Sequence, residues 1–276
     1  VKTAFEHIFR RLNVSAAIIE GDSFHRHTRA EMRAAIAEAE AEGRNISHFG
    51  PDANLLCDLA SLFKDFGETG TGKRRYYVHD EEEALLHGCP SGTFTDWEDL
   101  PSDADLLLYE GLHGAMVTKE CNVAQFADLL IGVVPIVNLE WIQKIHRDTK
   151  SRGYAEVDVT RTILRRMEDY VNYIAPQFSR TDINFQRVPT VDTSNPFIAR
   201  DIPTPEESFI VIRFRDPTKF DINFPYLLSM LDRSFISRRN TIVVPGGKML
   251  LAMELILMPI LQRMIIESEA GTRLVA

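Results

Sequence analysis

One short stretch gathers the side chains best suited to acid–base and anion-binding chemistry. An apolar run ends in Glu20, Gly21 and Asp22, and the next seven residues contain two histidines and two arginines: His25, His27, Arg26 and Arg29. A carboxylate at the end of a strand lies where open α/β sheets present reacting groups, and arginines just after it suit a phosphate or carboxylate substrate. The stretch therefore predicts a site for an anionic substrate. The alternative is a strand followed by a solvated charged loop.

A second acid ends a second apolar strand. Residues 104–109 are mostly apolar, Glu110 and Gly111 follow, and His113 lies three residues beyond the acid. This pattern is typical of a Walker B strand, whose carboxylate lies beside the Mg²⁺ of a bound nucleotide. A histidine in such a loop is more often structural than catalytic, although here it would face the same edge as Asp22.

A third group combines cations with one carboxylate. The helix expected over residues 138–150 carries Lys144, His146, Arg147 and Asp148, and Arg152 and Gly153 follow it. Cations at these spacings could close over transferring phosphates, and glycine would permit the hinge of a lid. The alternative, cations that stabilise a helix end, explains the lysine and the arginines but not Asp148.

A fourth segment resembles a phosphate-binding loop. Residues 67–73 fit the pattern G-x-x-x-x-G-K, but Arg74 replaces the hydroxyl that would bind Mg²⁺, and the preceding run predicts a helix rather than a buried strand. We interpret the match as accidental. The basic stretch that follows, with Tyr77 and His79, is either a second anion-binding arm or a basic surface strand.

The spacing of apolar residues predicts an α/β protein with a single domain over residues 1–276. The chain opens on a helix, and the order helix, strand, acidic loop suggests a unit whose first strand and glycine-rich loop precede Val1. We expect further helices over 30–42, 54–66, 138–150, 157–174 and 248–267, and strands over 104–111, 129–137, 183–188, 209–214 and 241–244.

Composition narrows the class of protein. Of 276 residues, 45% are hydrophobic and 26% charged, as in soluble globular proteins. We find no apolar run near the roughly 18 residues that span a bilayer and no signal peptide, so we expect a cytoplasmic protein without a membrane partner. The net charge of −9 argues against nucleic acid as a partner. Three cysteines without Cys-x-x-Cys spacing, Cys57, Cys89 and Cys121, predict packing thiols rather than a zinc site or disulfides.

Taken together, four motifs closely resemble the phosphoribulokinase family of bacterial type: Glu20-Gly21-Asp22-Ser23-Phe24-His25-Arg26, the Gly67 loop with Tyr77-Val78-His79, Tyr109-Glu110-Gly111-Leu112-His113, and Ile145-His146-Arg147-Asp148 with Arg152-Gly153-Tyr154. The resemblance covers practically the whole chain. It implies a P-loop NTPase-like fold related to nucleoside monophosphate kinases, with a mixed sheet flanked by helices. It also implies transfer of the γ-phosphate of ATP to the C1 hydroxyl of ribulose 5-phosphate, which gives ribulose 1,5-bisphosphate for carbon fixation.

The resemblance also implies a role for each residue. Asp22 matches the catalytic base, Lys144 and Arg147 match cations that stabilise the transferring phosphoryl group, and Glu110 and Asp148 match carboxylates at Mg²⁺. The sugar phosphate would be held by five residues: His25, Arg29, Tyr77, His79 and Arg152. Arg166 resembles a residue tied to effector response, because bacterial members are typically activated by NADH and inhibited by AMP. Family membership further implies a homo-oligomer.

The sequence departs from the family in one place. The glycine-rich ATP loop would lie immediately before Val1 and is absent, so we expect it in residues upstream. Plant members are redox-controlled through cysteines that Cys57, Cys89 and Cys121 do not match, so we expect no thiol switch. Two alternatives stay open: a related P-loop kinase acting on uridine or pantothenate, and a non-catalytic regulatory or scaffold protein on the same fold.

Overall fold

The computed structural model describes residues 2–268, 274 and 275, and the contacts within the chain define two compact units. Unit 1 comprises Val1–Asn13, Ile131–Arg165 and Thr181–Met264, and unit 2 comprises Val14–Leu130, Arg166–Arg180 and Ile265–Ala276. The chain thus crosses between the units several times. A single domain over residues 1–276 stays a prediction.

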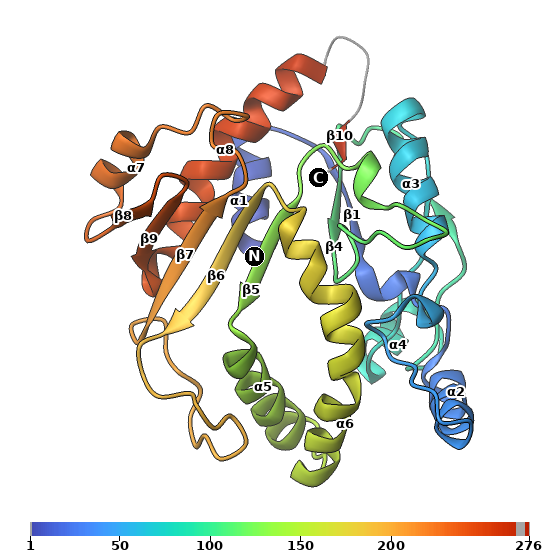
Figure 1. Cartoon of the computed structure of the whole chain (residues 1–276). Helices are drawn as coiled ribbons and strands as arrows, with labels where there is room; N and C mark the ends of the chain where they lie inside the picture. The colour runs from blue at the N-terminus through green and yellow to red at the C-terminus, as the bar shows by residue number, and fades with distance from the viewer. Residues whose placement is uncertain (1, 269–273, 276) are drawn as a thin grey trace. The chain divides into compact units, whose positions relative to one another are not determined.

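Unit 2 is built on a three-stranded parallel sheet in which β4 (Leu106–Glu110) lies between β1 (Ala16–Glu20) and β10 (Leu274–Val275) (Figure 1). The register pairs Ala16 with Leu106 and Glu20 with Glu110, so the two strands that end in a Glu-Gly pair finish side by side. The sequence therefore identified correctly that both acids stand at one edge of a sheet.

The glycines after these two strands allow the chain to turn in very little space. A Cβ on Gly21 would lie 2.7 Å from the Cα of Gly111 and 2.9 Å from the hydroxyl oxygen of Tyr109. A side chain at either glycine would force the two turns apart. The two glycines thus allow the turn that carries Asp22 and the turn after β4 to pack closely against each other.

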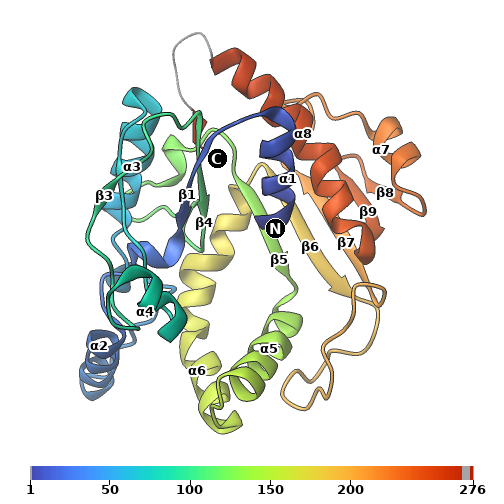
Figure 2. The same cartoon turned by 180° about the vertical axis from the view of Figure 1, so that it is seen from behind.

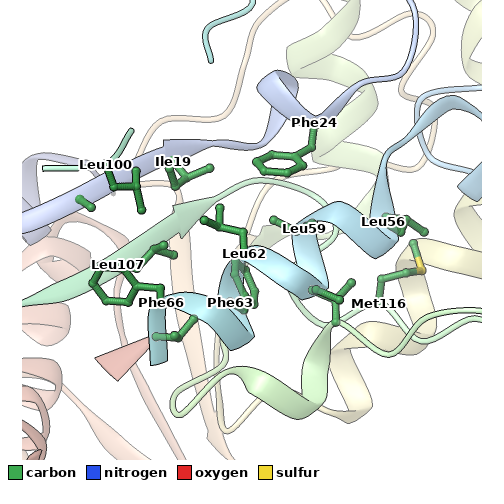
Figure 3. Packing of buried hydrophobic residues seen from close by; sticks show 14 of the residues in the cluster. Ile19, Phe24, Leu56, Leu59, Leu62, Phe63, Phe66, Leu100, Leu107 and Met116 are labelled. Carbon is green, nitrogen blue, oxygen red and sulfur yellow. The ribbon is translucent and has the colours of Figure 1, made fainter. Parts of the chain in front are cut away.

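The core of unit 2 forms where α3 (Leu56–Thr69) packs on the parallel sheet. Leu59, Phe63 and Phe66 recur at helical spacing and are at most 2% exposed, and Figure 3 shows them beside Ile19 and Leu107 of the strands. The helix ends at Gly70, which is left-handed at φ 70°. Gly67 lies within α3, so the G-x-x-x-x-G-K segment begins inside a helix and not after a buried strand. This agrees with the interpretation that the match to a phosphate-binding loop is accidental.

The remaining elements of unit 2 surround this core. The helix expected over 30–42 is α2 (Arg29–Ala41), which begins with a capping box in which the Thr28 side chain and Glu31 satisfy each other's backbone amides. The shorter elements are the helices η1 (Gly21–Phe24), η2 (Pro51–Ala53), α4 (Glu81–His87), η3 (Ala124–Phe126), η5 (Tyr170–Ile174) and η6 (Ala175–Ser179), and the antiparallel pair β2 (Lys73–Arg74) and β3 (Glu98–Asp99).

Unit 1 contains a five-stranded sheet in the order β5-β6-β7-β9-β8. The β5 strand is parallel to β6 and the other neighbours are antiparallel, so the sheet is mixed, as predicted. Figure 2 shows α1 (Lys2–Leu12) and α8 (Met249–Ser268) over one face of this sheet. The strands are β5 (Ile131–Pro135), β6 (Ile183–Pro189), β7 (Ser208–Phe214), β8 (Phe235–Arg238) and β9 (Thr241–Pro245), with the short helices α7 (Phe224–Met230) and η7 (Gly246–Lys248) near β8 and β9 in sequence.

Three further helical segments of the chain begin in unit 1. After α5 (Val137–His146), the helix continues as one turn of π-helix, η4 (Arg147–Ser151), which is a kind of turn often found at functional sites. The helix expected over 157–174 is α6 (Glu156–Asp169), which the π-helix η5 extends to Ile174. Arg147 and Asp148 of the third sequence motif therefore lie on a widened helical turn, while Lys144 and His146 lie on the α-helix before it.

The helix α8 corrects the expectation that no apolar run approaches membrane length. By length and composition alone, Gly246–Ser268 could cross a membrane. One side of it is nevertheless buried in unit 1, through Ala252, Met253, Ile256, Leu257, Ile260 and Leu261. Glu254 also lies 3.2 Å from the Nδ1 atom of His7 and 3.8 Å from Arg11, both on α1. A buried stripe and a paired carboxylate are features of a core helix.

The cysteines also differ from the prediction of three packing thiols. Cys57, in the first turn of α3, and Cys121, in the loop after β4, form a disulfide with their Cα atoms 5.3 Å apart, whereas Cys89 is free. Their separation of 64 residues gave no paired spacing in the sequence. The folding of α3 against β4 brings the two together.

We expect reduction of this disulfide to lower the free energy of unfolding of unit 2. Closing a loop of this length constrains the unfolded chain by about 4 kcal/mol in the chain-entropy model. Thermal unfolding with and without dithiothreitol measures the effect, and Cys57→Ala should abolish the response to reductant while Cys89→Ala leaves it unchanged. Three titratable thiols in the unreduced, unfolded protein would contradict the pairing.

Candidate active site

Asp22 lies in the 3-10 helix η1, directly after β1, and two histidines contact it. The Nε2 atom of His25 is 3.1 Å from one carboxylate oxygen, and that of His79 is 3.5 Å from the other. The hydrogen bond with His25 is the main reason that the pKa of Asp22 is lowered. The carboxylate is therefore ionised at neutral pH, and with 48% of its side chain exposed it is accessible to a substrate.

The side chain of Arg75 holds this turn in place. Its guanidinium donates to the carbonyl oxygens of Ser23 at 2.8 Å and His25 at 2.7 Å. The same group lies over the rings of Phe94 at 3.7 Å and Trp97 at 4.7 Å. Sequence reasoning placed Arg75 only within a basic stretch, and the structure identifies it as a clamp on the backbone on both sides of Phe24.

Four of the five predicted sugar-phosphate ligands gather around Asp22. Arg29 donates to the carbonyl oxygen of His79 at 2.6 Å. The ring of Tyr77 lies edge-on to His79 at 4.9 Å and to His25 at 6.2 Å between centroids. The fifth, Arg152, belongs to unit 1. The Asp22 cluster, as we call Asp22, His25, Arg29, Tyr77 and His79, thus combines one carboxylate with groups that can bind an anion.

Two histidines that sequence reasoning missed or ranked low lie behind this cluster. The ring of His48 is 4.2 Å from that of His25 between centroids, and burial lowers the pKa of His48 to about 3. His113 is 2% exposed, and burial lowers its pKa to about 4. Both are neutral at pH 7. His48 stands in a loop without any sequence pattern that would indicate its position.

We expect the buried His113 to make the stability of unit 2 depend on pH. The unfolded chain binds a proton near pH 6.5 and the folded chain near 4, so stability is lost as the pH falls between these values. The slope is about 1.4 kcal/mol per pH unit for one histidine. Urea unfolding at several pH values should show a shallower slope in His113→Gln and an unchanged one in the control His27→Gln. An unchanged slope in His113→Gln would contradict the assignment.

Glu110 is suited to a metal ion bound together with a nucleotide. It is exposed at the carboxyl end of β4, opposite Glu20 in the register. Mg²⁺ is usually held by one or two carboxylates plus substrate phosphates rather than by an all-protein cage. Among the described residues, no group of three or more histidine, cysteine, aspartate or glutamate side chains is arranged to hold a metal ion by itself. A single exposed carboxylate such as Glu110 fits a Mg²⁺ ion that is held mainly by the phosphates of a bound nucleotide.

Asp148 in unit 1 is surrounded by cations. Its Oδ2 accepts from Lys144 at 2.5 Å, and its Oδ1 from Arg147 at 3.0 Å and Arg152 at 3.2 Å. Burial raises the pKa of Asp148, but the hydrogen bonds from Lys144 and Arg147 lower it overall. These contacts favour a carboxylate that positions cations over one that binds Mg²⁺, so metal binding by Asp148 stays a prediction. His146, nearby on α5, donates to the carbonyl oxygen of Ala199 at 3.0 Å.

Arg166 lies on the part of α6 that belongs to unit 2. Its guanidinium is 5.6 Å from the ring of Phe49, which follows His48 in the chain. The ring of Phe49 in turn lies 6.1 Å from that of Tyr170. The side chain thus contacts the loop that packs against His25.

Comparisons with known proteins identify the family of this chain. The model of the "Phosphoribulokinase / Uridine kinase family" matches residues 1–194. The chain belongs to this family. The phosphoribulokinase of Nitrobacter vulgaris is 63% identical over 266 residues, which cover 96% of this chain and 91% of the relative. The phosphoribulokinase 1 of Cereibacter sphaeroides is 58% identical over 272 residues, 98% of this chain and 93% of the relative.

A solved structure agrees with these relatives. The phosphoribulokinase from Rhodobacter spheroides has a TM-score of 0.90 at 56% identity and covers 98% of this chain and 94% of that one. The predicted family, the α/β kinase fold and the enzymatic nature of the chain are therefore confirmed. Members of a kinase family use ATP, so the phosphoribulokinase family assignment also disfavours the non-catalytic alternative.

Proposed function

We propose that the chain transfers the γ-phosphoryl group of ATP to the C1 hydroxyl of D-ribulose 5-phosphate, which gives ribulose 1,5-bisphosphate for the Calvin cycle. The main support is the ionised carboxylate of Asp22, which His25 and His79 contact, in a chain whose relatives are named phosphoribulokinases. The product of this reaction is the sugar bisphosphate to which carbon dioxide is added.

In this mechanism, Asp22 is the general base. Its half-exposed carboxylate can accept the proton of the C1 hydroxyl as the oxygen attacks phosphorus. The neighbouring cationic and aromatic groups, Arg29, Tyr77 and His79, orient the sugar phosphate. A phosphorylated sugar suits this arrangement better than a nucleoside, because Arg29 and the histidines can neutralise a phosphate.

The cations of unit 1 stabilise negative charge on the group in transfer. Lys144 and Arg147 supply positive charge, and Asp148 keeps their side chains in fixed positions by accepting hydrogen bonds from both. Arg152 shares the same carboxylate and is the remaining proposed ligand of the sugar phosphate. Mg²⁺, held by Glu110, would supply further positive charge at the phosphates when ATP is bound.

A kinase assay across substrates tests the proposal. Ribulose 5-phosphate, uridine and pantothenate are supplied separately with ATP and Mg²⁺, and ADP release is measured. We expect turnover with ribulose 5-phosphate alone, and omission of Mg²⁺ should abolish it. Activity with uridine or pantothenate alone would replace our assignment with one of the related kinases.

The resemblance also supports regulation, which we propose to involve NADH as activator and AMP as inhibitor, in a cytoplasmic homo-oligomer. The position of Arg166 gives this a physical route, since its side chain contacts Phe49, and the adjacent His48 packs on His25. Replacing Arg166 by Gln should reduce the response to effectors more than the basal rate. Steady-state rates with and without each effector measure it.

A further inference from the structure

Asn54 is a buried amide that the proposed mechanism does not yet use. It follows the 3-10 helix η2, is 2% exposed, and pairs with His25 through a short antiparallel bridge of their backbones. Its side chain reaches the ring of His25, so that the Oδ1 atom lies 2.8 Å from Nδ1. The contact joins a second loop of unit 2 to the residue that bonds Asp22.

The hydrogen bonds of Asn54 determine which way its amide faces. The Nδ2 atom donates to the carbonyl oxygens of His48 at 3.0 Å and Gly50 at 2.7 Å. Carbonyl oxygens accept and cannot donate, so the nitrogen must face them and the amide oxygen must face His25. A flipped amide would place its oxygen against two carbonyl oxygens.

This orientation in turn fixes the proton on the imidazole. The amide oxygen of Asn54 can only accept, so Nδ1 of His25 carries a hydrogen. The other ring nitrogen, Nε2, faces the carboxylate of Asp22 at 3.1 Å, and because an ionised carboxylate can only accept, this contact is a hydrogen bond when Nε2 carries hydrogen as well. The partner on one side of a histidine thereby sets the chemistry available on its other side.

We propose that Asn54 is a positioning residue that holds His25 with Nδ1 protonated and Nε2 directed at Asp22. The proposal rests on the proposed role of Asp22 as base. Without Asn54, the ring is no longer held through Nδ1 and can rotate, so the hydrogen bond from Nε2 to Asp22 is no longer fixed. Three further side chains pack around His25 and Asn54: His48, Tyr77 and His113. They limit the movement of the His25 ring but do not replace its hydrogen bond to Asn54.

A double-mutant cycle tests this role. Asn54→Leu keeps the size of the side chain and removes its polar atoms, and we expect it to lower kcat about 10- to 100-fold, as for other partners that orient a functional histidine. In a His25→Gln background, the same substitution should change kcat less than about threefold, because its target is already absent. An equal loss of kcat in both backgrounds would overturn the proposal and leave Asn54 with a role in folding alone.

Two further variants separate positioning from support of the loop. Asn54→Asp keeps an acceptor for Nδ1–H and loses the donors to the His48 and Gly50 carbonyls, so it should retain more activity than Asn54→Leu. The matched control is Asn45→Leu, which removes a hydrogen bond from the same loop to Asp169 without touching His25. It should lower the melting temperature and leave kcat unchanged. Equal activity of Asn54→Asp and Asn54→Leu would contradict the acceptor role.

A spectroscopic measurement keeps this inference distinct from the proposed function. Long-range ¹H–¹⁵N spectra of the intact, ¹⁵N-labelled protein report which ring nitrogen of His25 bears hydrogen, with His25→Gln identifying the signal. We expect Nδ1 to carry hydrogen in the wild type, and we expect this hydrogen to be lost in Asn54→Leu while Nε2, which faces Asp22, keeps its own. A neutral ring with hydrogen on Nε2 alone in the wild type would refute the inference, whether or not Asp22 proves to be the base.

Discussion

Asp22→Asn should lower kcat by about 10²- to 10⁴-fold, the usual contribution of a positioned general base. The amide keeps the shape of the carboxylate but cannot accept the proton of the attacking hydroxyl. The affinity for ATP should change little, because the lost interaction acts chiefly in the transition state. Steady-state kinetics with ribulose 5-phosphate and ATP varied in turn measure both effects.

The hydrogen bond from His25 gives this prediction a dependence on pH. It lowers the pKa of Asp22 below the ordinary value of 3.8, so the base stays ionised throughout the neutral and mildly acidic range and is lost only in more acidic solution than for an ordinary aspartate. Replacing His25 by Gln should move this loss of activity to higher pH. The control Asp103→Asn changes an exposed carboxylate elsewhere in unit 2 and should leave kcat unchanged. A loss below about tenfold in Asp22→Asn would remove Asp22 from the role of base.

The parts of the site that sequence could predict are those fixed by local pattern. Apolar strands ending in Glu20 and Glu110 were readable because buried strands of a parallel sheet are short continuous apolar runs, and their pairing brings both acids to one edge. The helix that carries Lys144 and Asp148 was predicted in the same way. The prediction did not reveal the π-helical turn, because a single turn of five residues is too short for its changed side-chain spacing to be recognised in the sequence.

The parts that sequence could not predict depend on contacts between distant loops. His48 and Asn54 meet the turn after β1 from the loop between α2 and α3, and Arg75 meets it from the stretch after β2; for none of them does the sequence indicate this contact. The disulfide of Cys57 and Cys121 was missed for the same reason, since its 64-residue separation has meaning only after α3 has packed on the sheet. The residues that surround and hold the Asp22 cluster are therefore determined by tertiary packing and not by local sequence pattern.

The environment of Asp148 changes how its cations are understood. The family resemblance implied a metal ligand at Asp148, but its side chain is 7% exposed and already accepts hydrogen bonds from three cations. Such an arrangement fixes long, flexible side chains before substrate arrives. It thereby lowers the entropy lost when they meet a phosphate. Of the three, Lys144 is the most buried, with 21% of its side chain exposed against 55% for Arg147 and 52% for Arg152.

Lys144→Met should therefore lower kcat by about 10²- to 10³-fold, as when one preorganised donor to developing charge is removed. Methionine keeps the apolar stem, and Arg147 and Arg152 still bond Asp148, so the fold of unit 1 should be retained. Phosphoryl-transfer rates and thermal unfolding are measured together to separate the two effects.

The matched control is Lys150→Met, which removes an exposed lysine from the π-helical turn η4, directly after the helix α5 that carries Lys144. It changes net charge by the same amount as Lys144→Met but leaves the cations around Asp148 in place. We expect its kcat to stay within about twofold of wild type, because exposed charges are screened by solvent and salt. If both variants lost activity equally, the effect would belong to the general charge of the helix, and Lys144 would have no specific part in the transfer. A large loss in Lys144→Met alone would instead support a role for this one ammonium group, held by Asp148, in stabilising the phosphoryl group in transit.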